Sequence, residues 1–392
     1  MNKRLRVLLL ALATVGLTVA GVASAGQAKQ RFAVRQAQTG APTKVAGYAS
    51  TPELAVQQKS YKLGAPTNPG FLFLSDPDTN DATAKMTIFS PSGYASTLTQ
   101  TPGSTVGKAY ALVKANQLGG AILPLSGPVV VGNPADPALV TAYAQCKSAN
   151  DPVTPQQVLV LNTSLQGAAI QVPDFINVAG PYVTQEICLT PPATTPFQAQ
   201  VVLANFTING MFTNGAVAGP YQWSTDLTPY SGTVPDPAST VEVRTYVALP
   251  SSLVMRRLKT KSSIFAIGGK LAINGVSTAG LKLDLYYARG SKPAADYTNP
   301  SLVGLTGKTK KPARTLALKS KGLFLFVGRR VKKKTYFQAR LEDEWHLVDA
   351  NGNPICDGPS PSQLPIPCRD ELLAPMNSNQ VVVKPPKKKR HH

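Results

Sequence analysis

The chain has 392 residues, of which 43% are hydrophobic, 31 are Gly and 34 are Pro. That proline content excludes a helical bundle, because proline breaks helix interiors, and the hydrophobic content excludes a largely disordered chain. The formal net charge of +20 is unevenly placed: residues 26–250 hold 11 Lys or Arg against 11 Asp or Glu, whereas residues 251–392 hold 26 against 9, a net of +17. Attraction to polyanions is therefore expected only of the C-terminal part.

The N-terminus has the order of an export signal. Basic residues come first, then an apolar run and an Ala-x-Ala sequence, namely Lys3, Arg4, Arg6, residues 7–20 and residues 23–25. This order predicts a signal peptide over residues 1–25, with an uncleaved membrane anchor as the alternative, for which the apolar run is short. No later segment is apolar and long enough to span a bilayer. The sequence thus predicts a secreted, extracellular or cell-envelope protein.

Two stretches follow the signal. Residues 26–47 are small and polar without a sustained apolar period, which predicts a flexible leader. Residues 48–250 contain short apolar runs rich in Val, Ile, Phe, Tyr and Thr, separated by Pro, Gly, Asn and Asp. Regularly spaced runs of this kind predict an all-β region of antiparallel sheets packed as a sandwich. The Pro- and Thr-rich sequence near 190–196 is a candidate internal boundary.

One segment of this region has a helical signal. Asp136 is placed to cap a helix, Pro137 suits its first position, and Tyr143 and Cys146 would then lie one turn apart. A strand over the same residues is the open alternative. Asn-Gly pairs, which tolerate the positive φ of tight turns, predict hairpins at Asn209, Asn214, Asn274 and Asn351.

The four cysteines are Cys146, Cys188, Cys356 and Cys368. Their spacing lacks the close CxxC pairs of a zinc site, and an even number in an exported protein predicts two disulfides. Of the three possible connectivities, Cys146 with Cys188 and Cys356 with Cys368 keeps each bond within one predicted domain. Free thiols are the alternative.

The clearest alternation lies within residues 262–341. Leu281, Leu283 and Leu285 alternate with polar residues, and the run KGLFLFVGRRVKKKTYFQARL repeats the period of two after a Gly. This order of strands and turns resembles the bacterial Ig-like or transthyretin-like sandwich domains of secreted proteins. The resemblance implies an Ig-like β-sandwich over residues 251–350, with a spacer, adhesive or ligand-presenting role, and no catalytic residue. Residues 351–392 are expected to form a disulfide loop and a basic tail.

Basic residues cluster in and beyond this domain. We predict a polyanion-binding surface made of Lys308, Lys310, Lys311, Arg329, Arg330, Lys332, Lys333, Lys334, Lys387, Lys388, Lys389 and Arg390. The partners that fit an exported protein are an anionic cell-wall polymer, an acidic glycan or an anionic membrane surface, and export disfavours nucleic-acid recognition. A solvated face without a specific partner is the alternative.

Signals of chemistry are weak. Asp76, Asp78 and Asn80 resemble the start of an EF-hand loop, but the required Gly and final Glu are missing, so we predict no metal site. Two Gly-Lys runs fail the P-loop spacing, so no cofactor is predicted. His346 lacks a recognisable nucleophile, so no catalytic residue is assigned and a non-enzymatic role is favoured. A glycan-binding or glycan-active site in the N-terminal β region, using Tyr221, Trp223 and Tyr230, is the alternative function.

Overall fold

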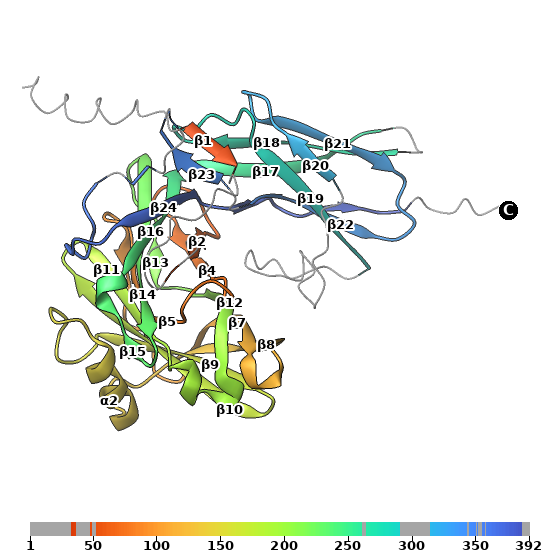
Figure 1. Ribbon diagram of the computed structural model, residues 1–392. Helices are drawn as coiled ribbons and strands as arrows, with labels where there is room; N and C mark the ends of the chain where they lie inside the picture. Colours follow the sequence, from red (N-terminus) through yellow and green to blue (C-terminus); the bar gives the residue numbers. More distant parts are fainter. Residues whose placement is uncertain are drawn as a thin grey trace, which may run out of the picture.

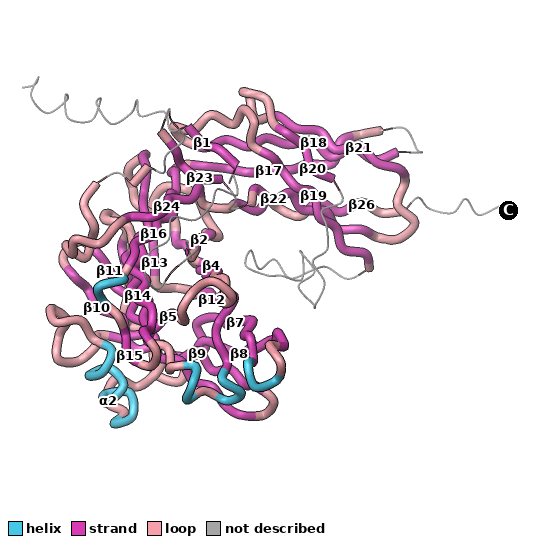
Figure 2. Tube along the Cα trace, in the orientation of Figure 1, coloured by secondary structure: helices cyan, strands magenta, loops and turns pink. Residues whose placement is uncertain are grey.

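The computed structural model describes residues 33–36, 48, 52–260, 264–290, 314–342, 345–349, 351, 355–356 and 358–385. The predicted signal peptide lies outside these residues. Figure 1 shows two lobes, a larger one at lower left and a smaller one at upper right. Figure 2 shows that strands dominate both lobes and that the helical segments belong to the larger one. The all-β prediction is confirmed.

The larger lobe is built on one long sheet. Most of its strands come from residues 53–249, namely β2 (Glu53–Gln57), β4 (Gly70–Leu74), β5 (Thr83–Phe89), β7 (Thr105–Ala115), β8 (Ala121–Val131), β9 (Gln157–Leu165), β10 (Ala168–Ala179), β11 (Tyr182–Cys188), β12 (Ala199–Thr207), β14 (Gly219–Ser231), β15 (Val234–Pro235) and β16 (Val241–Leu249). Three strands from the chain ends extend it: β1 (Ala33–Gln36), β23 (Trp345–Val348) and β24 (Cys368–Leu373). The strand order is β1-β23-β24-β16-β14-β5-β11-β10-β9-β8-β7-β12-β4-β2, with β15 beside β14.

This sheet folds back on itself around an aromatic core. The last strand, β2, packs against β16, and Thr245 Oγ1 donates a hydrogen bond to the Leu54 carbonyl oxygen at 2.5 Å. Inside the fold, Trp223 lies edge-on to the rings of Phe71 and Phe212, each with centroids 5.4 Å away. A small sheet of β3 (Pro66–Thr67), β13 (Phe212–Thr213) and β6 (Ala95–Ser96) adds to this lobe. Two packed sheet layers result from a single folded sheet.

The predicted helix is confirmed as α2 (Pro137–Cys146). Asp136 caps it by accepting a hydrogen bond from the backbone N–H of Ala138 at 2.9 Å, and Pro137 takes the first position. Tyr143 and Cys146 are its buried residues. The described helical segments otherwise are short 3₁₀ turns: η2 (Asn116–Leu118), η3 (Pro192–Thr194), η4 (Pro196–Gln198) and η5 (Pro237–Ser239).

The smaller lobe is a β-sandwich of two sheets. One sheet has the order β17 (Ser251–Leu258), β18 (Ile264–Ile273), β21 (Leu323–Arg329). The other contains β20 (Arg314–Ala317), β19 (Lys282–Arg289), β22 (Thr335–Leu341), β25 (Met376–Asn377) and β26 (Val381–Val383). Inward-facing Leu283, Phe326 and Ala339 are buried between the sheets, as the alternation predicts.

The segment limits differ from the sequence-based ones in three places. Four residues of the expected leader, Ala33–Gln36, form β1 and pair with β23. The expected tail contains β24, which joins the large sheet, and β25 and β26, which join a sheet of the smaller lobe. Its apolar residues form strands because they pair with sheet edges that would otherwise be exposed. Residues 190–196, the candidate boundary, connect β11 and β12 within the same sheet.

Two expectations about strand pairing are also corrected. The pair of β16 and β24 is parallel, whereas all other described pairs are antiparallel. None of the Asn-Gly pairs at Asn209, Asn214 and Asn274 closes a hairpin, because the strands flanking each of them pair with other strands. The Asn274 amide instead donates to the Leu249 carbonyl oxygen at 2.8 Å, tying the two lobes together. The fourth pair, at Asn351, continues into a residue outside the described ones.

Candidate functional site

Both predicted disulfides and their connectivity are confirmed. Cys146 is bonded to Cys188 across 42 residues, and Cys356 to Cys368 across 12. The first bond ties the end of α2 to β11, and the second closes a loop that leads into β24. Disulfides of this kind fit an oxidising compartment, as the export prediction requires.

The basic residues at the end of β21 and in the β21–β22 connection are all exposed. They are Arg329, Arg330, Lys332, Lys333 and Lys334. Lys334 Nζ lies 5.0 Å from the centre of the Tyr336 ring, which orients that side chain by a cation–π contact. The other predicted polyanion-binding residues, Lys308, Lys310, Lys311, Lys387, Lys388, Lys389 and Arg390, lie outside the described residues.

Further basic residues, which sequence reasoning did not select, lie at the same end of the sandwich. In the register of the sheets, β17 ends where β18 begins and β21 ends, since Leu258 faces Ala266 and Ile264 faces Arg329. In the other sheet, Arg289 faces Thr335. Arg256, Arg257, Lys259 and Arg289 therefore join the connection residues at one end of the smaller lobe, which we call the basic end. The sequence could have indicated them, because each lies at or near the end of a run of alternating residues.

The basic end is not neutralised by neighbours that the structure describes. The salt bridges found among the described residues involve none of its Lys or Arg side chains. Each Lys or Arg held close to an anionic surface contributes about 1 kcal/mol of attraction, which falls as salt rises. The basic end is therefore able to hold a polyanion by charge.

A second set of ionisable groups is buried in the larger lobe. Glu186 of β11 and Asp226 of β14 both face Thr87 of the intervening β5, and Asp226 also faces Glu242 of β16. Residues opposite each other across strands point to the same sheet face, so these three carboxyls form one row. All three belong to buried residues. We call them the acidic row.

Basic side chains and the disulfide-closed segments cover the acidic row. Lys85 Nζ lies 2.5 Å from Glu186 Oε1 and donates to the Cys146 carbonyl oxygen at 2.8 Å. Arg244 Nε lies 3.0 Å from Glu242 Oε1, and its Nη2 donates to the Gly358 carbonyl oxygen at 3.3 Å. Each ion pair thus also binds the backbone of a segment anchored by a disulfide. The ion pairs of the acidic row therefore attach both disulfide-anchored segments to the sheet.

Burial is the main influence on the pKa of two members of the acidic row, Asp226 and Glu186. It raises the pKa of Asp226 to about 7, with a further increase from the charge of Glu242. It also raises the pKa of Glu186 to about 7, although Lys85 acts in the opposite direction. Asp174 in the neighbouring β10 has its pKa raised by complete burial and by Glu186. Carboxyls with shifted pKa values can mark active sites. Here they lie on a sheet face that other parts of the chain cover, so their role is structural.

The aromatic residues proposed for glycan contact are occupied in packing. Trp223 is 0% exposed and Tyr230 is 6% exposed, and the Tyr230 hydroxyl donates to the Leu189 carbonyl oxygen at 2.5 Å. The Tyr221 hydroxyl donates to the Val217 carbonyl oxygen at 2.7 Å. A sugar ring cannot stack on Trp223 or Tyr230 without opening the core, so that set of residues does not form a glycan site.

The remaining chemical candidates have structural partners. His346 Nδ1 lies 2.7 Å from Asp370 Oδ1, so the pair joins β23 to β24. The side chain of Asp76 accepts hydrogen bonds from the N–H of Asp78 and the hydroxyl of Thr79, as in an ordinary Asx turn. Among the residues that the structure describes, no group of three or more His, Cys, Asp and Glu side chains could hold a metal ion.

Comparisons with known proteins do not identify a family. No protein-family model and no curated protein matches the sequence significantly. Solved structures give weak likenesses. One is a variant of BcpA, the major pilin subunit of Bacillus cereus, with 10% identity, a TM-score of 0.21, and 83% of this chain and 71% of that chain covered.

Two further likenesses are weaker. The type II cohesin dyad of the ScaA scaffoldin of Acetivibrio cellulolyticus has 9% identity, a TM-score of 0.18 and coverage of 81% and 98%. CfaE, the adhesive subunit of CFA/I fimbria of enterotoxigenic Escherichia coli, has 8% identity, a TM-score of 0.14 and coverage of 75% and 94%. Scores this low support no argument about function. Within the described part of the chain, no helix combines the length and apolar character needed to cross a membrane.

Proposed function

We propose that this chain is an exported, non-enzymatic protein of the cell envelope whose basic end binds anionic polymers or surfaces. The observation that carries the proposal is the gathering of basic residues from three strands, β17, β19 and β21, and from two connections at a single end of the smaller lobe. Export is supported by the signal-like N-terminus and the two disulfides. An extracellular polyanion, such as a phosphate-rich wall polymer or an acidic glycan, suits this compartment and charge.

The geometry favours charge over a shaped recognition site. Arg329, Arg330 and Lys332 to Lys334 are exposed on a connection between two sheets, where their side chains can follow an extended polymer. Lys side chains act as mobile point charges, and Arg adds bidentate contacts to phosphate or carboxylate groups. Binding should therefore depend strongly on salt and weakly on the identity of the polymer.

Neutralising three adjacent lysines tests this proposal. We expect Lys332→Gln, Lys333→Gln and Lys334→Gln together to weaken binding of the full chain to polyphosphate by about tenfold or more at low salt, at about 1 kcal/mol per lysine before screening. The matched control replaces the exposed Lys59, Lys62 and Lys108 of the larger lobe by Gln, which removes the same charge elsewhere. Fluorescence anisotropy with a labelled polymer at low and moderate salt measures both affinities.

The comparison between the two triple variants decides the outcome. A large loss in the first variant and a small one in the control supports binding at the basic end. Equal losses would mean that only total charge matters, and absence of binding by the unmodified chain at low salt would remove the proposal altogether.

A further inference from the structure

The outward face of the β17–β18–β21 sheet is aliphatic. In the cross-strand register, Val254 and Leu323 lie on either side of Lys270, Leu325 lies beside Gly268, and Val327 beside Ala266. The exposed fractions are 55% for Val254, 61% for Leu323, 48% for Leu325 and 44% for Val327. We call the face formed by these four large side chains, with Leu258 and Ala266, the aliphatic face.

Strand β21 carries apolar residues on both of its sides. Between the exposed residues of β21, Phe324 and Phe326 point inward and are buried, as are Leu253 and Met255 of β17. Strands with apolar residues on both faces are characteristic of sheets that are covered on both faces. The sandwich core covers the inner side of this sheet. Several large aliphatic side chains exposed on one sheet face can mark an interaction surface.

Only basic charges accompany the aliphatic face. Residues 251–283 and 314–341 contain no Asp or Glu, so none of the three strands has an acidic side chain. Arg256, Lys270 and Arg329 point to the same side as the aliphatic residues, by the alternation of each strand. All three are exposed, and no salt bridge among the described residues includes them. The face therefore combines exposed aliphatic side chains with positive charges.

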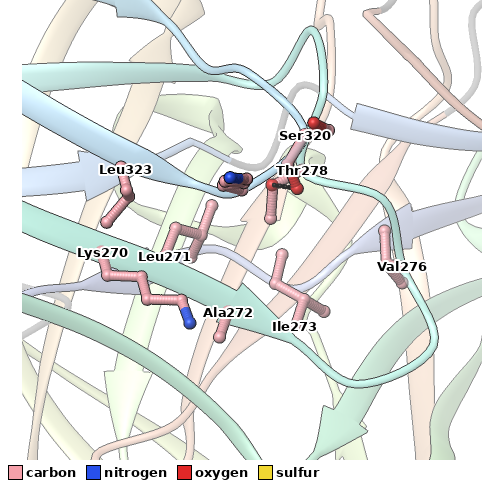
Figure 3. Close-up of a pocket in the computed structure, with 9 residues that line it drawn as sticks. Lys270, Leu271, Ala272, Ile273, Val276, Thr278, Ser320 and Leu323 are labelled. Carbon is pink, nitrogen blue, oxygen red and sulfur yellow. Dashed lines mark hydrogen bonds between the residues drawn. The ribbon is translucent and has the colours of Figure 1, made fainter.

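A pocket lies at one end of this face. It has a volume of about 400 Å³, and Lys270, Ala272, Leu323, Thr278, Ser320 and Lys321 are among the residues that line it. Figure 3 shows Leu323 and Lys270 on neighbouring strands, with Thr278 and Ser320 at the opposite wall. The Thr278 hydroxyl is within 3.2 Å of the carbonyl oxygens of Lys319 and Ser320. Two lysines thus flank an open hollow beside the exposed leucine.

The charge of the aliphatic face and its lack of aromatic residues indicate which kind of partner it binds. A second copy of this chain related by a two-fold axis would bring the same basic residues together across the contact, which is unfavourable. A protein partner usually meets anchoring aromatic residues, whereas the outward positions of these three strands carry no Trp, Tyr or Phe. Exposed aliphatic side chains among Lys and Arg are the pattern of a surface that lies on anionic lipid, with apolar groups at the acyl boundary and cations at the headgroups.

We propose that the aliphatic face docks on an anionic lipid bilayer, with Val254, Leu323, Leu325 and Val327 entering the headgroup region and Lys270 and Lys321 receiving lipid phosphates at the pocket. The proposal rests on the proposed function for its electrostatic attraction and adds a lipid partner and an orientation. A soluble polyanion needs only the charges, whereas a bilayer also uses the aliphatic side chains. That difference separates the two proposals experimentally.

The experiment uses the full chain and two paired variants of equal charge. Leu323→Thr with Leu325→Thr reduces the apolar character of the face, and the control, Val153→Thr with Val217→Thr, changes two side chains that are 86% and 73% exposed in the larger lobe. Binding is measured by co-sedimentation with vesicles of phosphatidylcholine plus phosphatidylglycerol, and with phosphatidylcholine alone. Polyphosphate binding is measured in parallel.

We expect the unmodified chain to bind the anionic vesicles and not the neutral ones. The Leu323/Leu325 variant should lose about tenfold in vesicle affinity, because less apolar surface is buried at the interface, while its polyphosphate affinity stays unchanged. The control variant should keep both affinities.

Other results would overturn the lipid proposal. Equal vesicle binding by both variants would show that charge alone holds the protein, leaving only the proposed function. A dimer that dissociates in the Leu323/Leu325 variant, measured by analytical ultracentrifugation, would assign the face to a second copy. Polymer binding without vesicle binding would reject the lipid partner alone, whereas loss of all anion binding would reject both proposals.

Discussion

Asp226 shows how one residue couples the sheet to pH. Its carboxyl is buried on β14 beside Glu242, and burial raises its pKa from 3.8 to about 7. The folded state therefore holds a proton on Asp226 at pH values where the unfolded chain has lost it. Stability from this group is fully present below the unfolded pKa and is lost as the pH rises through about 7.

We predict that Asp226→Asn flattens the pH dependence of stability. An amide cannot ionise, so the free energy of unfolding between about pH 4 and pH 8 should vary less than in the unmodified protein, by up to about 4 kcal/mol for a shift of about three pKa units. Urea denaturation at a series of pH values measures the slope. The matched control, Asp81→Asn, makes the same substitution at an exposed position. An unaltered slope in the Asp226 variant would mean that this carboxyl stays ionised in the fold.

Two adjacent glycines of β18 differ in what surrounds them. A Cβ atom on Gly269 would lie 2.2 Å from the Val254 carbonyl oxygen and 2.3 Å from the Phe324 ring, both within the sandwich. A Cβ on Gly268, on the outward side, would meet Leu258 Cδ1 at 3.0 Å, the end of a flexible side chain. The aromatic packing of β21 therefore requires glycine at one position and only tolerates it at the other.

We expect Gly269→Ala to destabilise the protein by about 2 kcal/mol or more, because backbone and ring must move apart. Gly268→Ala should change stability by less than about 1 kcal/mol, because Leu258 can rotate away and alanine is more favourable than glycine within a strand. Thermal unfolding followed by circular dichroism compares the two variants. Similar losses in both would contradict the packing assigned to Phe324.

Strand β10 could not be predicted from the sequence pattern. It runs from Ala168 to Ala179 through Pro173 and the buried Asp174, and it pairs with β9 on one side and β11 on the other. Proline and a buried acid inside a two-sided strand contradict strand propensity, so the sequence did not indicate it. The neighbouring β9 and β11, with regular apolar residues, were predictable. Tertiary pairing holds β10 in place.

The lobes form one molecule because the chain crosses between them more than once. After the smaller lobe is built, β24 returns to pair in parallel with β16, and β25 and β26 then pair with β22. The Tyr61 hydroxyl of the larger lobe donates to the Pro375 carbonyl oxygen at 2.5 Å. One hydrophobic cluster contains residues of both lobes, including Trp223 and Phe326.

This crossing predicts cooperative unfolding of the whole chain. We expect circular dichroism and tryptophan fluorescence to report one coincident thermal transition. A fragment of residues 26–250 lacks β24 and leaves β16 unpaired on one side, so we expect it to show no cooperative transition at the temperature of the full chain. A fragment that melts at the same temperature as the full chain would show that the larger lobe is independent.

The sequence by itself determined the features that depend on neighbours along the chain. Short apolar runs and alternation predicted most strands of both lobes, Asp136 and Pro137 predicted the start of α2, and the even cysteine count in a chain with an export signal predicted the disulfides. It also located the charge excess in the C-terminal part. These are local or compositional properties, which is why one sequence suffices for them.

Only the tertiary structure decided which distant residues meet. It gathered Arg257, Lys259 and Arg289 with the β21–β22 connection at the basic end, aligned Glu186, Asp226 and Glu242 into a row, and gave β24 to the larger lobe. It also left Val254, Leu323, Leu325 and Val327 exposed on the outer side of the β17–β18–β21 sheet. Strand order and sheet faces arise from long-range pairing, which local patterns do not encode.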